Sequence, residues 1–352
     1  MTFKNLIIDE NTKIINALKQ LSKTGEKNLV IINANKKLVG VLSDGDLRRA
    51  ILKKININNS IKNIYNKKPL FFYKDKLKLS DIKKILVSKK LFFAPIIDKT
   101  KNITDIITWD FIFGKKNRTK NVKIKIPVIV MAGGKGTRLQ PFTDILPKPL
   151  IPINGKSVLE HVFDKFLNYG LKEFYLSINY KSKILKAFFD ELKPNYKIKF
   201  LEEKKPLGTA GPLGIINLKN SKTFFVTNSD IILDIDYFDL LNFHLENKNI
   251  ATCVVAAKDY VIPYGTCKIN SSGKLLQLKE KPTYNFLVNT GLYLFDKSVL
   301  NLIKKNEKMD MNELIGIMLK KNLKIMVYPV SEKSWIDVGQ WNEYKKAITK
   351  LA

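Results

Sequence analysis

The chain has few of the residues that most often bind metals or form crosslinks. Its 352 residues include two cysteines and two histidines. Cys253 and Cys267 show no CxxC or other metal-ligand spacing, which argues against a zinc site and a disulfide framework. So few cysteines in a chain of this length indicate a reduced, cytoplasmic protein. His161 and His244 fall in amphipathic helical patterns, where packing or a solvated face is the expected role.

Long apolar runs are also missing. No stretch approaches the roughly 20 residues needed to span a bilayer. The N-terminal segment MTFKNLIIDENTK has no cationic start followed by an apolar core, so it does not read as a signal peptide. We therefore expect no membrane partner.

Negative charge is scarce: 62 Lys and Arg residues face 32 Asp and Glu residues, for a formal net charge of +30. Such a charge can indicate a nucleic-acid or anionic-membrane partner, or simply lysines on solvated faces throughout. No block of basic residues interleaved with aromatic residues is present, which favours the second interpretation. We expect no nucleic-acid partner, although a positive field would attract phosphorylated substrates.

The first 114 residues repeat themselves with an offset of 65 positions. The helical pattern of Ile14, Ala17 and Leu21 returns at Leu79, Ile82 and Leu86, and the strands near 29–33 and 38–43 return at 94–98 and 103–108. Each copy is too small to bury its apolar face alone, so the two should pack together. We predict a domain over 1–114, with repeats at about 1–60 and 61–114.

The segment VGVLSDGDLRRAIL in the first copy resembles the strand-to-helix element of a CBS pair, an α/β module that often senses adenosine nucleotides. The resemblance implies that Ser43 and Asp46 hold a ribose. In the second copy Phe111 stands where the carboxylate would be. Both an adenosine-nucleotide sensor and a structural or dimerising module, with Ser43 as a helix cap, stay open.

A polar, basic connector is predicted over 115–125, and an α/β domain over 126–352. In this domain apolar strands alternate with amphipathic helices, which predicts a Rossmann-like, mostly parallel mixed sheet with ligands at the carboxyl ends of the strands. Strands are expected near 126–131, 173–178, 197–201, 223–227, 250–257, 264–270, 288–295 and 323–329. Helices are expected near 156–169, 182–191, 211–218, 236–248, 310–320 and 339–350.

The most informative segment is Met131–Ile153, MAGGKGTRLQPFTDILPKPLIPI, which follows an apolar strand. Its glycines let backbone N–H groups approach a ligand closely, and Arg138 and Lys148 add fixed positive charge, a combination suited to polyphosphate. The spacing excludes a P-loop, because Gly136 follows Lys135, and a dinucleotide fingerprint, because Leu139 stands where a glycine is needed. The prolines beside Lys148 stiffen the backbone that presents its ammonium.

This segment resembles the signature of the sugar-phosphate nucleotidyltransferases, and the resemblance extends over the whole of 126–352. It implies the nucleotidyltransferase fold and a reaction between a nucleoside triphosphate and a sugar 1-phosphate. Arg138 and Lys148 would contact the triphosphate and the charge that develops during the reaction. The nucleotide-binding residues implied by the resemblance are Ala132, Gly133, Gly134, Gly136, Thr137, Gly208, Thr209 and Asn228.

Two aspartates follow predicted strands, Asp230 after the run 224–229 and Asp337 in the sequence WIDVG. Mg²⁺ suits phosphoryl chemistry because it binds one or two carboxylates and keeps positions for phosphate oxygens. The resemblance implies that Asp230 and Asp337 hold the metal and that Asp230 is catalytic. The alternative is a pair of turn or helix-capping aspartates. No general base stands out, and the attacking phosphate oxygen, already ionised, requires none.

The loop LGTAGPL at 207–213 looks most like that of guanylyltransferases, which implies GTP as the substrate. The sugar-binding residues implied by the resemblance are Tyr264, Gly265, Glu280, Lys281, Asn289 and Thr290. The order of domains resembles bacterial glucosamine-1-phosphate guanylyltransferases of legionaminic acid pathways, and a homo-oligomer is expected. Cytidylyl transfer to phosphocholine and a non-catalytic regulatory role are the alternatives.

Overall fold

The computed structural model describes residues 3–24, 26–75, 79–89, 91, 93–109, 124–218 and 221–351. The chain divides into two compact units, and each is described by itself. One consists of Met1–Ile112 and Asp259–Asn285, and the other of Phe113–Lys258 and Phe286–Ala352. Of the predicted connector, positions 115–123 lie outside the described residues, as does Phe111.

The first unit contains two three-stranded sheets of the same build, with strand orders β1-β2-β3 and β4-β5-β6. Its first half runs η1 (Phe3–Leu6), β1 (Ile7–Asp9), α1 (Ile14–Thr24), β2 (Asn28–Ile32), β3 (Leu38–Ser43), α2 (Asp44–Leu52) and η2 (Ile61–Asn63). Its second half runs β4 (Phe72–Tyr73), α3 (Leu79–Ser88), β5 (Phe93–Ile97) and β6 (Ile103–Thr108). Strands β5 and β6 thus begin and end 65 positions after β2 and β3, and both strand pairs carry a register shift at the corresponding place.

The two halves meet at equivalent positions. Lys37 and Asn102, 65 positions apart, form an antiparallel bridge, and the Lys37 ammonium donates to the Asn102 side-chain oxygen at 2.9 Å. Phe93 and Ile106 of the second half are buried in one cluster with the core of the first, which includes Leu29. Residues of the second copy therefore contribute to the hydrophobic core of the first.

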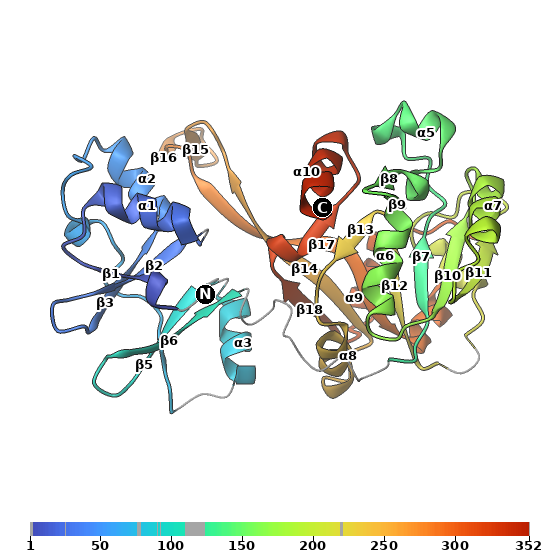
Figure 1. The fold of residues 1–352 in the computed structure, drawn as a ribbon, viewed down its shortest axis with the longest axis horizontal. Helices are drawn as coiled ribbons and strands as arrows, with labels where there is room; N and C mark the ends of the chain where they lie inside the picture. The colour runs from blue at the N-terminus through green and yellow to red at the C-terminus, as the bar shows by residue number, and fades with distance from the viewer. Residues whose placement is uncertain are drawn as a thin grey trace. The chain divides into compact units, whose positions relative to one another are not determined.

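A β-hairpin, formed by β15 (Thr266–Ile269) and β16 (Leu275–Lys279), groups with the first unit. It is continuous with the long strands β14 (Ala251–Val261) and β17 (Thr283–Asp296) of the second unit (Figure 1). Every residue of β16 is exposed, so this ribbon is held mainly by its own backbone ladder.

The second unit is built on a seven-stranded sheet of order β11-β10-β7-β12-β17-β14-β18 (Figure 1). The remaining strands of this sheet are β7 (Val128–Met131), β10 (Glu173–Ile178), β11 (Lys197–Glu202), β12 (Thr223–Asn228) and β18 (Ile325–Val330). β7 is parallel to both β10 and β12, whereas β12 and β17 are antiparallel. The predicted mostly parallel mixed sheet is confirmed.

Helices cover both faces of this sheet. Successive strand residues point to opposite sides, so neighbouring residues of β7 pack against different helices. Val128 and Val130 pack with α6 (Val158–Leu167), α7 (Ser182–Leu192) and α8 (Tyr237–Glu246). Ile129 packs on the other face with η5 (Gly211–Ile215), η6 (Lys297–Leu302) and α9 (Met311–Lys320). The second unit is thus a three-layer α/β structure, and α10 (Trp341–Leu351) adds its buried Ala347 to the first face.

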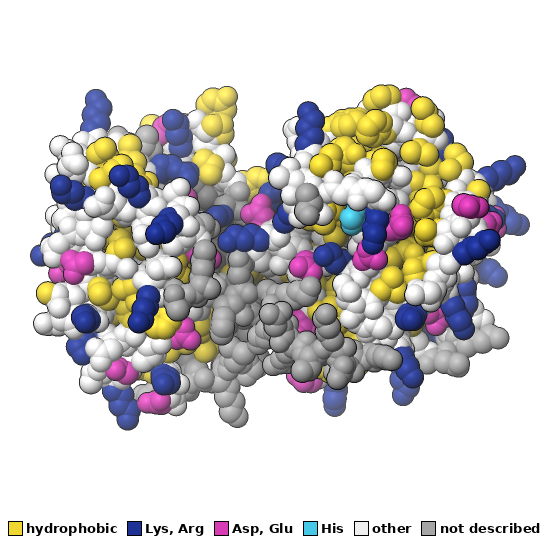
Figure 2. All heavy atoms as spheres, viewed as in Figure 1, with side chains coloured by type: hydrophobic (Ala, Val, Ile, Leu, Met, Phe, Trp, Pro, Cys, Tyr) yellow, Lys and Arg dark blue, Asp and Glu magenta, His cyan; other side chains and the backbone are white. Residues whose placement is uncertain are grey.

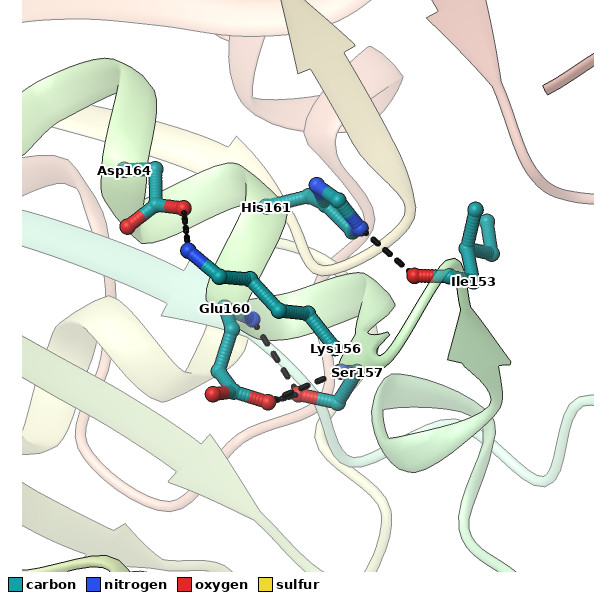
Figure 3. Close-up of polar contacts among 6 residues, drawn as sticks. All are labelled: Ile153, Lys156, Ser157, Glu160, His161 and Asp164. Carbon is teal, nitrogen blue, oxygen red and sulfur yellow. Dashed lines mark hydrogen bonds and ion pairs between the residues drawn. The ribbon is translucent and has the colours of Figure 1, made fainter. Parts of the chain in front are cut away.

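The start of α6 shows how the segment after the signature is anchored (Figure 3). The side chains of Ser157 and Glu160 form a capping box, which satisfies backbone N–H groups that the first turn leaves free. Lys156 pairs with Asp164 at 2.6 Å. His161 Nε2 contacts the Ile153 carbonyl at 2.8 Å, so this histidine serves local structure. A short ribbon of β8 (Pro152–Ile153) and β9 (Lys156–Ser157) precedes the helix.

One predicted helix is wrong. Residues 211–218 form only the short 3₁₀ helix η5, because Gly211, Pro212 and Gly214 are poor helix formers. The Met309 carbonyl instead accepts the N–H groups of Ala210 and Gly211 at 2.9 and 3.0 Å. Among the described residues, no helix combines the length and the apolar character that a bilayer crossing requires.

The positive charge is dispersed. Figure 2 shows Lys and Arg side chains scattered over the visible face, interspersed with acidic and uncharged groups. Several lysines of the second unit pair with carboxylates, such as Lys186 with Glu202 and Lys199 with Glu173. This arrangement is typical of solvated faces.

His244 lies in a buried polar network between α8 and β14. Its Nδ1 is 2.9 Å from the Thr252 hydroxyl, which also accepts a hydrogen bond from the Asn249 amide at 3.0 Å. The hydroxyl proton is therefore available to His244 Nδ1, which fits the neutral imidazole. Burial lowers the pKa of His244 from 6.5 to about 4, against a smaller opposing effect of Asp296.

We predict that His244 makes the protein acid-sensitive. Because the folded pKa lies below the unfolded value, the unfolded chain binds the extra proton between pH 6.5 and about 4, and stability falls over that window. The full effect is about 3 kcal/mol. Denaturant unfolding of wild type and His244→Gln at pH 7, 5 and 4 measures it. Equal losses of stability in the two proteins would contradict the assignment.

Candidate active site

The site lies at the carboxyl edge of the sheet. Met131 at the end of β7 is in register with Ser177 of β10 and with Asn228 of β12. The backbone ladder continues one residue further, since Ala132 N–H donates to the Ser177 carbonyl and Ser229 N–H to the Met131 carbonyl. The glycine loop and the turn that carries Asp230 therefore start side by side.

The three glycines of the loop have different roles. A Cβ on Gly133 would lie 2.6 Å from Glu203 Oε1, and one on Gly136 would lie 2.8 Å from Lys148 Cβ. Gly136 also has a φ of +69°, which favours glycine. A Cβ on Gly134 would meet nothing within 4 Å. Gly133 and Gly136 thus serve close packing, whereas Gly134 leaves space open beside the loop.

The rest of the signature folds back over this loop through η3 (Thr137–Leu139), α5 (Phe142–Ile145) and η4 (Lys148–Leu150). The buried Thr143 hydroxyl donates to the Gly136 carbonyl at 3.1 Å. From α10, Trp341 Nε1–H donates to the Gln140 carbonyl at 3.0 Å, and the Phe142 and Trp341 rings lie 4.9 Å apart. The signature is therefore held both from within and by the C-terminal helix.

Lys148 and Asp230 form an ion pair through Lys148 Nζ and Asp230 Oδ2. Their side chains are only 13% and 14% exposed, so water screens this attraction weakly. The predicted catalytic lysine and metal-binding aspartate are thus in direct contact. Arg138, the other predicted cation, is exposed on η3 at the same edge.

Asp337 is brought to the same place by a two-stranded antiparallel ribbon of β13 (Ile231–Leu233) and β19 (Trp335–Asp337). Ile231 is paired with Asp337, and Val338 N–H donates to the Asp230 carbonyl at 2.9 Å. Burial raises the pKa of Asp337, and the charge of Asp230 raises it further. Three groups lower this pKa: the Gly339 N–H, which donates a 2.7 Å hydrogen bond to Asp337, and the positive charges of Lys148 and Arg138.

The two aspartates fit a site for one hard divalent cation. The described residues contain no group of three or more His, Cys, Asp or Glu side chains suited to a metal, so these two carboxylates stand without a third such ligand. Mg²⁺ commonly takes one or two carboxylates and completes its shell with water and phosphate oxygens. A cation between Asp230 and Asp337 would also relieve the repulsion that raises the pKa of Asp337.

The LGTAGPL loop, which holds the predicted nucleotide-binding residues Gly208 and Thr209, is tied to the start of α9. The Thr209 hydroxyl accepts the Met311 N–H at 2.8 Å, and Thr209 N–H donates to Asp310 Oδ1 at 3.2 Å. Gly208 has a φ of +79°, and a Cβ there would lie 2.6 Å from Asp310 Oδ1. The Thr209 hydroxyl therefore binds the backbone at the start of α9.

Two predicted sugar-binding residues lie in β17. The Thr290 hydroxyl is buried and donates to the Val254 carbonyl at 2.9 Å, whereas Asn289 is exposed and donates to the Tyr293 hydroxyl at 2.6 Å. A Cβ on the next residue, Gly291, would lie 2.6 Å from Asn228 Nδ2. Asn228 and Gly291 are thus in close contact, and Asn289 presents the more accessible side chain.

The other four predicted sugar-binding residues belong to the hairpin of the first unit. Thr266 pairs with Lys279, which places Gly265 opposite Glu280. A Cβ on Gly265 would lie 3.0 Å from Glu280 Oε2. Tyr264 is 74% exposed, and Lys281 has a φ of +39°. Antiparallel pairing thus brings the two predicted segments together.

Glu203 is a residue that the motifs did not single out. Its carboxylate accepts hydrogen bonds from the Ser177 hydroxyl and from Leu207 N–H, and it borders Gly133. The Asn179 amide donates to its carbonyl at 2.8 Å. One side chain thereby joins the glycine loop to the loop that begins at Leu207. The only signal in the sequence is an acidic residue four positions before that loop.

In the first unit, Ser43 and Asp46 form the capping box of α2. The Asp46 carboxylate accepts hydrogen bonds from the Ser43 hydroxyl at 2.7 Å and from Arg49 at 2.5 Å. Ser43 is thus the helix cap that the sequence predicts, and both side chains have partners within the protein.

Comparison with known proteins shows which families the two parts of the chain match. The nucleotidyl transferase family model matches residues 127–352, and the CBS domain model matches residues 1–53. The chain is 31% identical over 224 residues to the catalytic subunit beta of mannose-1-phosphate guanylyltransferase from Dictyostelium discoideum. It is 33% identical over 226 residues to a mannose-1-phosphate guanyltransferase from Gibberella zeae.

These matches cover 61% of this chain and 62% and 61% of the two relatives, so the chain spans about three fifths of their length. Crystal structures of HddC from Yersinia pseudotuberculosis, alone and complexed with GMP-PN, superimpose with TM-scores of 0.51 and 0.50 at 25% and 26% identity. Both cover 64% of this chain and all of HddC.

We predict that Gly136→Ala and Gly134→Ala act differently. At Gly136 a methyl group meets Lys148 and forces a left-handed alanine, which should lower the free energy of unfolding by about 1–2 kcal/mol. Gly134→Ala should leave stability within about 0.5 kcal/mol. Its methyl group enters the open space beside the loop, so nucleoside triphosphate affinity should fall. Denaturant unfolding and calorimetric titration test both; an unchanged affinity in Gly134→Ala would remove this face of the loop from the site.

Proposed function

Because the chain belongs to the nucleotidyl transferase family, we propose that it transfers a nucleoside monophosphate from a nucleoside triphosphate to a sugar 1-phosphate. The products are a nucleoside diphosphate sugar and pyrophosphate. The observation that carries the proposal is the convergence of Lys148, Asp230 and Asp337 beside the glycine loop.

The reaction needs little covalent chemistry from the protein. An oxygen of the sugar phosphate attacks the α-phosphorus, and the bond to the bridging oxygen of the leaving pyrophosphate breaks. Loop N–H groups near Gly134, together with Arg138 and Lys148, bind the triphosphate and offset the charge that develops. The attacking oxygen is already ionised, so no residue has to remove a proton.

Asp230 and Asp337 would hold Mg²⁺, which when bound supplies positive charge to phosphate oxygens and helps to align them. Lys148 has three donors and contacts Asp230 through one, so it can reach a phosphate oxygen while it still contacts the carboxylate.

For the nucleotide we propose GTP. The LGTAGPL loop supports it, as do the guanylyltransferase names of the two relatives and the GMP-PN complex of HddC. For the sugar, those names favour mannose 1-phosphate, and the order of domains favours glucosamine 1-phosphate of a legionaminic acid pathway. Glu280 and Asn289 would accept and donate hydrogen bonds to sugar hydroxyl groups, and Lys281 would pair with the sugar phosphate.

We predict pyrophosphate release with GTP and a hexose 1-phosphate, and loss of turnover in Asp230→Asn. Pyrophosphate release is measured across four nucleoside triphosphates and a panel that contains mannose 1-phosphate, glucosamine 1-phosphate and phosphocholine. Asp230→Asn retains the size of the side chain and removes the charge that holds both Lys148 and the metal, so turnover should fall at least 10²-fold.

Asp234→Asn is the matched control, since Asp230 and Asp234 lie at the two ends of β13 and Asp234 pairs with Lys165 on a more exposed surface. Near-normal turnover in Asp230→Asn would remove this residue from the catalytic site. Turnover only with CTP and phosphocholine would replace the sugar by another acceptor, and no turnover with any pair would favour a regulatory protein.

A nucleotide at the first unit is the second candidate, because residues 1–53 match the CBS domain. An adenosine ribose would have to share Asp46 with Ser43 and Arg49. We predict that AMP, which lacks the triphosphate of the catalytic substrate, binds the full chain in a calorimetric titration. Asp46→Asn should weaken the affinity for AMP about tenfold, whereas Asp44→Asn should leave that affinity unchanged. No heat with AMP, ATP or GTP beyond that of the catalytic site would favour a structural or dimerising module.

A further inference from the structure

Lys181 makes an unusual connection to the signature segment. It follows β10 at the carboxyl edge of the sheet and is the residue before α7. Its ammonium donates to the carbonyl oxygens of Asp144 at 2.6 Å and Thr143 at 3.1 Å. These carbonyls belong to α5, the short helix between Arg138 and Lys148. A lysine from another part of the chain thus caps the end of α5, where carbonyls have no partner within the helix.

The backbone of Lys181 is specialised for this contact. Its φ is +53° and its ψ is 34°, a left-handed conformation that costs a residue with a Cβ roughly 1 kcal/mol. Lys181 stands at the N-cap position of α7 but gives that helix no side-chain hydrogen bond. The side chain serves α5 and not the helix that it precedes.

The residues next to Lys181 contact the same region. Tyr180 N–H approaches the Gly133 carbonyl at 3.5 Å, and the Asn179 amide donates to the Glu203 carbonyl at 2.8 Å. The Lys181 ammonium lies 5.3 Å from the centroid of the Tyr180 ring. The segment 179–181 therefore supports the glycine loop and α5 together.

The contact reaches the reacting groups through Thr143. Lys181 binds the Thr143 carbonyl, the Thr143 hydroxyl binds the Gly136 carbonyl, and Gly136 packs against Lys148. If α5 shifts, the turn at Gly136 and the position of the Lys148 side chain shift with it. Reacting groups displaced by about 1 Å can lose about 10²-fold in rate.

We infer that Lys181 is a positioning residue: it fixes α5, and through α5 it sets the places of Lys148 and Arg138 relative to Asp230. Its effect on turnover rests on the proposed function, whereas its effect on the signature segment does not. A purely structural lysine would lower stability without a selective effect on kcat.

The test compares Lys181→Met with Lys181→Arg and with Lys183→Met, an exposed lysine two residues later on the same helix. Lys181→Met removes the donors and keeps most of the side-chain length. Amide hydrogen exchange of peptides covering 138–150 should quicken at least tenfold in Lys181→Met and stay unchanged in Lys183→Met. In the pyrophosphate assay kcat should fall about 10- to 100-fold with KM within about threefold. Lys181→Arg should restore most of both.

Unchanged exchange over 138–150 in Lys181→Met would overturn the inference, whether or not the protein turns over any substrate. A lower melting temperature with normal kcat would likewise show a structural lysine only. Faster exchange over 138–150 in Lys181→Met, combined with no pyrophosphate release by the wild-type protein, would retain the positioning role and refute the proposed function.

Discussion

The pairing of β13 with β19 is the constraint on which the site depends, because it brings Asp230 and Asp337 together from distant parts of the chain. Burial raises the pKa of Asp337, and repulsion from the neighbouring Asp230 carboxylate raises it further. Lys148 offsets this repulsion through its ion pair with Asp230. Lys148 can reach Asp230 only because the signature segment folds back over the glycine loop. The glycine loop, the turn that carries Asp230 and the β13–β19 ribbon therefore form one arrangement.

The strands and most helices of this arrangement were predictable from the sequence. Short, nearly continuous apolar runs mark β10 and β12, and apolar residues at helical spacing mark α9. The offset of 65 positions places β5 and β6 once β2 and β3 are recognised. The ribbon of β13 and β19 was not predictable, since three-residue segments show no periodicity and their pairing is a tertiary event. The failed helix at 211–218 has a related origin, because the N–H groups of Ala210 and Gly211 donate to the Met309 carbonyl, a partner far away in the sequence.

Motifs located the site better than they assigned atoms within it. Thr209 lies in the predicted loop, yet its hydroxyl caps α9, and the Thr290 hydroxyl is bound to β14. Small polar residues in such loops often satisfy backbone groups of the scaffold. Glu203 binds the Ser177 hydroxyl and the Leu207 N–H, and Lys181 binds two backbone carbonyls. Backbone partners leave no pattern of residue types in the sequence.

Lys148 and Lys181 use their positive charges in different ways at this edge of the sheet. Lys148 faces a carboxylate and is 13% exposed, so its charge acts over a short distance on groups that water scarcely screens. Lys181 faces two carbonyl dipoles, which hold an ammonium in place without neutralising it. The net positive charge near the loop therefore exceeds what the Lys148–Asp230 pair alone would leave. In the proposed reaction a triphosphate would meet fixed charges on a preset backbone, which would leave little reorganisation for the moment of reaction.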